Sequence, residues 1–181
     1  KNVYHVGLVG QNVSNTQLAT QNKIDLRNHS FTAEFWAKKV EGYMLMFGSN
    51  ETMLVVGVNG KLPFVVIANG ETADENGNTA EPFEVSANAP LTFKDDEWVF
   101  WQLSYKARDP QTETSENLLS LTACYGDQTK KVLTGVAVPD INSNGKMTWG
   151  ALSTSQFADL ALWDYVRTDV HLPMGMKRKS G

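Results

Sequence analysis

The sequence predicts an all-β protein in which two antiparallel sheets pack face to face as a jelly-roll sandwich. Helical periodicity is almost absent from the chain. Short or alternating apolar runs recur throughout instead, and Gly, Asn, Asp and Pro separate them. No shift in composition divides the chain, so we expect a single sandwich domain over residues 1–170 and a C-terminal connector at 171–181.

The apolar runs define the expected strands. We predict strands at 3–9, 16–20, 31–38, 43–48, 52–58, 62–68, 81–86, 90–93, 97–107, 117–125, 129–136, 145–150 and 156–166. Asn59-Gly60 lies between two of these runs and is the strongest short-range signal for a hairpin. Gly126-Asp127 separates another pair in the same way. Longer polar loops are expected at 70–80 and 108–116.

Alternation predicts which side of each strand faces the core, because successive side chains point to opposite faces of a sheet. In strand 31–38 the apolar row consists of Phe31, Ala33, Phe35 and Ala37. In strand 97–107 it consists of Val99, Trp101, Leu103 and Tyr105, opposed by Trp98, Phe100, Gln102 and Ser104. Burying one large apolar side chain is worth about 1.5–3 kcal/mol, so we expect the apolar rows to lie between the sheets.

The last predicted strand has apolar residues on both faces. Its inward row is expected to be Ala158, Leu160, Leu162 and Val166. The other row is Phe157, Asp159, Ala161, Trp163 and Tyr165. That second row is too aromatic for bare solvent, which indicates the floor of a curved sheet that loops partly cover.

The composition excludes several classes of function. The 181 residues are 41% hydrophobic and 20% charged, with a net charge of −4 and interspersed signs, so nucleic acid is not an expected partner. No apolar run approaches the ~20 residues of a membrane-spanning helix, so no membrane insertion is expected. Cys124 is a single cysteine and cannot form an internal disulfide. The opening Lys1 and the tail PMGMKRKSG indicate a piece of a longer, multidomain protein.

Three ordered motifs carry a family resemblance. They are Phe31–Trp36 in FTAEFWAKK, Trp98–Tyr105 in DDEWVFWQLSYKA, and Asp159–Asp164 in KMTWGALSTSQFADLALWDYVRT. Together they resemble the concanavalin A-like sandwich in its laminin-G-like and pentraxin-like branch, over about residues 16–168. The resemblance implies a laminin-G-like module that recognises carbohydrate, glycoprotein or matrix, located outside the cell or at its surface.

The same resemblance implies adhesion or targeting rather than catalysis. Many members of the family bind calcium in loops at the sandwich edge. The calcium cluster of pentraxins has no counterpart here, because the corresponding segment GALSTSQFAD carries no such set of acids.

The candidate ligand site is centred on Trp36 and Glu34, on the polar side of strand 31–38. A Trp ring can stack on the apolar face of a sugar while neighbouring polar groups orient its hydroxyls. Trp98, Phe100 and Trp163 are expected to share that face. The alternative is that Trp36 lies under a loop as secondary core.

Asp95 and Asp96, followed by Glu97, are candidate calcium ligands, because hard cations need several oxygens from one or two loops. The alternative is a solvated acidic turn. Zinc or proton-transfer chemistry is not expected, because His5, His29 and His171 are scattered.

The enzyme hypothesis within this fold requires paired carboxylates on one strand, as in the glucanases of the superfamily. No such run occurs, so a glycoside hydrolase is the most remote of three hypotheses. The first is a non-catalytic carbohydrate- or glycoprotein-binding module. The second is a structural or protein–protein interaction domain with no sugar ligand.

Overall fold

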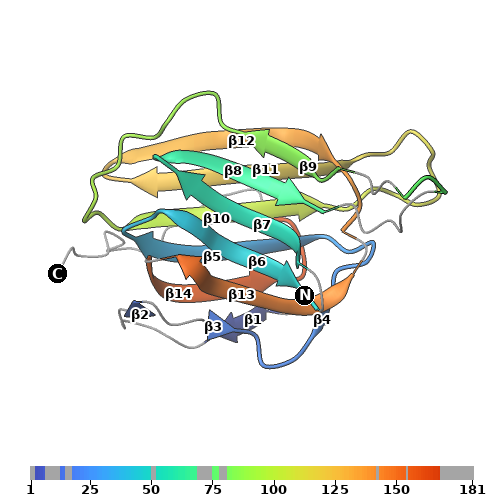
Figure 1. Cartoon of the computed structure of the whole chain (residues 1–181), viewed down its shortest axis with the longest axis horizontal. Helices are drawn as coiled ribbons and strands as arrows, with labels where there is room; N and C mark the ends of the chain where they lie inside the picture. Colours follow the sequence, from blue (N-terminus) through green and yellow to red (C-terminus); the bar gives the residue numbers. More distant parts are fainter. Residues whose placement is uncertain are drawn as a thin grey trace.

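Two antiparallel sheets stacked face to face form the protein, as the computed structural model shows (Figure 1). The structure describes residues 3–6, 13–14, 18–49, 52–68, 75–77, 81–141, 143–153 and 155–167. Across these ranges no helix has the length and apolarity to cross a membrane. The predicted connector at 171–181 lies outside the described residues.

Sheet 1 has the strand order β1-β14-β5-β10-β11-β12, with β2 beside β14. Its strands are β1 (Val3–Val6), β2 (Val13–Ser14), β5 (Phe31–Lys38), β10 (Val99–Lys106), β11 (Asn117–Tyr125), β12 (Gln128–Val138) and β14 (Gln156–Trp163). Sheet 2 has the order β3-β13-β6-β7-β8-β9, with β4 beside β13. Its strands are β3 (Leu18–Ala19), β4 (Ile24–Asp25), β6 (Gly42–Gly48), β7 (Thr52–Asn59), β8 (Leu62–Ile67), β9 (Phe83–Ser86) and β13 (Asn144–Ser153).

The chain passes repeatedly from one sheet to the other. It changes sheet after β2, β4, β5, β9, β12 and β13, so strands far apart in sequence become neighbours, such as β14 and β5. The predicted all-β jelly-roll sandwich is therefore confirmed. The two-residue strands β2 and β4 were not predicted, because a pair of residues carries no readable alternation.

The apolar rows of both sheets meet in one core, as predicted. Phe35, Trp101 and Leu162 are at most 1% exposed and belong to the same buried cluster. Phe35 lies 6.5 Å from the ring of Trp149, which comes from β13 in the opposite sheet. The alternation of β5 and β10 thus correctly predicted which residues point between the sheets.

The facing predicted for the first half of β14 is wrong. A β-bulge lies between Ala158 and Ala161 in the pairing with β5, and Asp159 adopts a φ of 53°. The bulge adds one residue and inverts the alternation before it. Phe157 therefore packs into the core, 6.0 Å from Phe35, whereas Ala158 lies on the outer face. Leu160 and Leu162 point inward as expected, and the strand ends at Trp163 rather than at 166.

The hairpin signal was correct but its turn is shifted by one residue. Asn59 pairs with Leu62, so the two central residues of the turn are Gly60 and Lys61, with φ of 56° and 64°. Positive φ at both central positions is what a type I′ hairpin requires, and glycine reaches it without a steric penalty.

The strand predicted at 90–93 is not formed. Pro90 has no amide hydrogen for a ladder. Isolated hydrogen bonds hold the segment instead. The Leu91 N–H donates to the carbonyl of Lys61 (2.8 Å), and the Thr92 N–H donates to the Tyr125 hydroxyl (3.1 Å).

Candidate functional site

The strand register assembles the outward side chains of sheet 1 into three rows that run across β14, β5, β10 and β11. The aromatic row consists of Ala158, Trp36, Phe100 and Cys124. The acid–amide row consists of Glu34, Gln102 and Thr122. The hydroxyl row consists of Trp163, Thr32, Ser104 and Ser120. The predicted site residues therefore do share one face.

The aromatic row does not present its rings to a ligand. Trp36 and Phe100 are 7% exposed and Trp98 is 4% exposed, and together they form a second buried cluster. The rings of Trp36 and Phe100 meet edge to face, 5.3 Å apart. A covered ring offers a sugar little surface for stacking, so burial favours the alternative that Trp36 is secondary core, and the ligand role of these rings stays a prediction.

Glu34 is buried beneath the same face, and its carboxylate is fully engaged. The side-chain amide of Gln102 donates to Oε2 (2.8 Å), and the indole N–H of Trp163 donates to Oε1 (2.9 Å). The guanidinium of Arg167 pairs with Oε2 at 3.3 Å. A buried charge is tolerated only when it is paired and hydrogen-bonded, and these donors meet that condition.

A segment that we call the strap, residues 164–167, crosses the outer face after β14. The hydroxyl of Thr32 donates to the carbonyl of Tyr165 (2.7 Å) and accepts the N–H of Arg167 (2.9 Å). The Arg167 guanidinium lies 4.1 Å from the centre of the Trp163 ring. The strap therefore covers Glu34 and one face of Trp163, a contact that sequence patterns could not reveal.

The predicted calcium ligands lie in a turn. Asp95 pairs with Lys61 at 3.1 Å and its side chain is 91% exposed, and the carboxylate of Glu97 accepts the N–H of Lys94 (2.9 Å). Among the described residues, no group of three or more His, Cys, Asp or Glu side chains could hold a metal ion. Calcium binding at Asp95 and Asp96 stays a prediction without a coordination sphere to support it.

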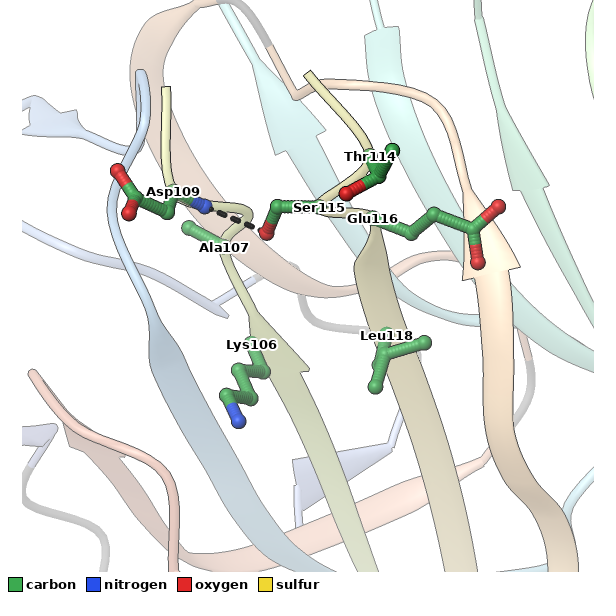
Figure 2. Close-up of a pocket in the computed structure, with 7 residues that line it drawn as sticks. All are labelled: Lys106, Ala107, Asp109, Thr114, Ser115, Glu116 and Leu118. Atoms are coloured by element: carbon green, nitrogen blue, oxygen red, sulfur yellow. Dashed lines mark hydrogen bonds between the residues drawn. The ribbon is translucent and has the colours of Figure 1, made fainter. Parts of the chain in front are cut away.

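A pocket of about 460 Å³ opens where β10 ends and β11 begins (Figure 2). Its lining residues are Lys106, Ala107, Asp109, Thr114, Ser115, Glu116 and Leu118. Lys106 pairs with Leu118, two residues along each strand from the Ser104–Ser120 pair, so the pocket continues the outer face beyond the hydroxyl row. Figure 2 shows the connecting loop above this pair of side chains.

Hydrogen bonds fix the pocket loop from within. The N–H of Asp109 donates to the Ser115 hydroxyl (2.9 Å), the dashed line in Figure 2. The Asp109 carboxylate accepts the N–H of Gln111 (3.0 Å) and the hydroxyl of Thr112 (3.0 Å). A loop that is already ordered loses little entropy when a ligand binds.

A second network anchors the loop to the segment that follows β12. The N–H of Arg108 donates to the Asn117 side-chain carbonyl (2.8 Å), and the Asn117 amide donates to Asp140 (2.8 Å). Arg108 also pairs with Asp140 at 3.0 Å. Hydrogen bonds from Arg108, and then from Asn117, lower the pKa of Asp140 below its usual range. The sequence predicted only a polar loop at 108–116, although its Asp, Pro, Ser and Thr residues are a recognisable signal of such turn chemistry.

Neither a protein-family model nor a curated protein matches the sequence. A solved structure of similar chain path is the botulinum neurotoxin serotype G binding domain, at 10% identity and a TM-score of 0.46, covering 92% of this chain and 42% of that one. A native heptameric SAP-like pentraxin from Limulus polyphemus shows 12% identity and a TM-score of 0.47, covering 92% and 76%. The chain thus spans 42% of the length of the first of these, and likenesses this distant carry no argument about what it binds.

Proposed function

We propose that this domain is a non-catalytic recognition module whose ligand is carbohydrate or glycoprotein, bound in the pocket between β10 and β11. The observation that carries the proposal is the pocket itself. Its volume, about 460 Å³, lies in the usual range for small-ligand sites, and an ordered loop forms one of its walls.

The lining chemistry suits a polyhydroxylated ligand. Leu118 and Ala107 supply apolar surface for the C–H face of a sugar ring. Lys106, Thr114 and Glu116 supply an ammonium donor, a hydroxyl and a carboxylate acceptor for ring hydroxyls. The pocket therefore combines the two kinds of contact that sugar recognition requires.

The resemblance to the laminin-G-like and pentraxin-like branch of the concanavalin A-like sandwich supports the same proposal. It also supports an extracellular or cell-surface setting and a role in adhesion or targeting within a multidomain protein. The alternative is an interaction domain with no sugar ligand, and the burial of Trp36, Trp98 and Phe100 is the observation that favours it.

A glycan array, read with and without calcium, tests the proposal. We expect wild type to bind, and Thr114→Trp, which puts a large ring into the pocket lining, to weaken binding by at least about tenfold. Thr134→Trp on β12 introduces the same side chain at an exposed position outside the pocket and should bind like wild type. Wild type that binds no glycan under either condition, or Thr114→Trp that binds unchanged, would favour the interaction-domain alternative.

A further inference from the structure

The outer face of sheet 2 carries apolar side chains across β6, β7 and β8, which lie side by side in Figure 1. Register pairs Tyr43 with Gly57, and Gly57 with Phe64. Tyr43 is 37% exposed and is the exposed large hydrophobic residue of the described chain. The row beside it runs from Thr148 through Met46, Val55 and Val66 to Glu84. The middle strands of this face thus carry mainly apolar side chains.

A close approach at Gly57 shapes this surface. A Cβ atom built on Gly57 would lie 2.5 Å from Cζ of Phe64, which shows that the Phe64 ring rests against the backbone of β7. The ring of Tyr43 adjoins it at 6.1 Å, tilted by 69°. Tyr43 and Phe64 therefore form an aromatic pair, packed edge to face over Gly57 of β7, which we call the aromatic platform.

We propose that the aromatic platform is a second binding site, separate from the pocket, and that its ligand is a neutral oligosaccharide chain. Aromatic rings offer an apolar surface on which the C–H face of a sugar ring can stack. The row that starts at Tyr43 ends at Ser86 of β9, an exposed hydroxyl. Strands lie ~4.8 Å apart, so this row spans about 14 Å and accommodates a short oligosaccharide laid across the strands.

The size of the platform argues against a protein partner. An aromatic side chain presents roughly 150–250 Å², so Tyr43 at 37% exposed leaves on the order of 70 Å² open. A stable protein interface needs about 800 Å² from each partner, far more than this residue and its half-buried neighbours can supply.

The lack of charged side chains in the platform row favours an uncharged ligand. The row from Tyr43 through Gly57 and Phe64 to Ser86 contains no ionisable carboxylate or amine. Two exposed charges lie outside this row: Glu84 of β9 pairs with Val66 in the neighbouring row, and Lys146 lies on β13. A neutral chain laid along the platform row leaves no charge of that row unpaired.

The platform and the pocket occupy outer faces of opposite sheets. One domain could thus engage two chains, or two segments of one chain, and a polymeric glycan would be cross-linked. Two-site attachment raises the apparent affinity for a polymer without any new contact.

Affinity electrophoresis in gels containing mannan, xylan or β-glucan tests the proposal on the intact chain. We expect at least one polysaccharide to retard wild type. Tyr43→Ala should weaken that retardation by about tenfold, whereas Tyr43→Phe, which keeps the ring, should stay within about twofold. The melting temperature of each variant reports whether it folds, and sedimentation reports its oligomeric state.

Equal mobility of wild type and Tyr43→Ala in every gel would overturn the proposal. A wild-type dimer that Tyr43→Ala dissociates would overturn it in favour of a second copy of the chain as the occupant. Thr114→Trp in the same gels separates the two sites. If Thr114→Trp loses retardation while Tyr43→Ala keeps it, the pocket proposal is supported and the platform proposal is overturned.

Discussion

On sheet 1 the outer face holds a covered aromatic row beside carboxylate, amide and hydroxyl groups. On sheet 2 the middle strands hold Tyr43, Phe64 and aliphatic side chains, with Glu84 on β9 and Lys146 on β13. The polar groups of the first face bind one another: Glu34 alone accepts bonds from Gln102, Trp163 and Arg167. On sheet 2 the Tyr43 ring packs edge to face on Phe64 and is still 37% exposed. Polar composition therefore did not make the first face the open one, and the pocket proposed as the ligand site lies at the edge of that face.

Glu34→Ala should cost the most, because it leaves Arg167 without its buried counter-charge. Both side chains of this ion pair are largely buried, at 17% and 8% exposed. Removing one partner of a buried pair costs about 3–5 kcal/mol. Urea-induced unfolding measures the loss as a shift of the transition midpoint.

Glu84→Ala, an exposed acid on sheet 2, is the matched control and should stay within about 0.5 kcal/mol of wild type. If the two variants lose the same free energy of unfolding, the contact between Glu34 and the strap does not stabilise the fold. The proposed difference between the two outer faces would then be wrong.

Gly57→Ala tests the other face and should have the next largest effect. The added methyl would lie 2.5 Å from Phe64 and 2.7 Å from the carbonyl of Gly42, so the ring and the backbone must both shift. Overpacking of this kind typically costs about 1–3 kcal/mol. Thermal or urea unfolding reports the cost.

The double variant Gly57→Ala/Phe64→Ala removes one of the two clashes while losing the Phe64 ring. A coupling energy of about 0.5 kcal/mol or more between the two substitutions is expected for residues in contact. Strictly additive losses of stability would show that the Phe64 ring does not rest on Gly57. The described packing of the platform would then be wrong.

The sequence could predict facing wherever alternation was unbroken, and it failed where the backbone was irregular. Phe35 and Trp101 were placed correctly in the core because β5 and β10 alternate without interruption. Phe157 was misplaced because the bulge at Asp159 inverts the order, and no local pattern announces a bulge at a non-glycine residue.

Exposure was the harder property to predict. Alternation put Trp36 on the outer face, but its cover depends on contacts between distant segments. Arg167 reaches Glu34 across 133 residues of sequence, and the Tyr43–Phe64 contact needs the register of three strands. These features follow from topology, which single-strand patterns do not contain.

The smallest expected effect is a pH dependence of stability at Asp140, which lies beside the proposed pocket and not beside the proposed platform. Hydrogen bonds from Arg108 and Asn117 lower the pKa of Asp140 in the folded state. The ionised carboxylate therefore stabilises the folded protein at pH values above about 3.9, the ordinary pKa of an aspartate. That contribution is lost as the pH falls through the folded pKa. Because Asp140 and Arg108 are 51% and 37% exposed, we expect less than about 1 kcal/mol. Asp140→Asn should therefore be slightly less stable than wild type at pH 7, and the stability gap in urea unfolding should narrow as the pH falls below about 3.9. A stability gap that persists unchanged at pH 3 would show that charge on Asp140 does not anchor the pocket loop.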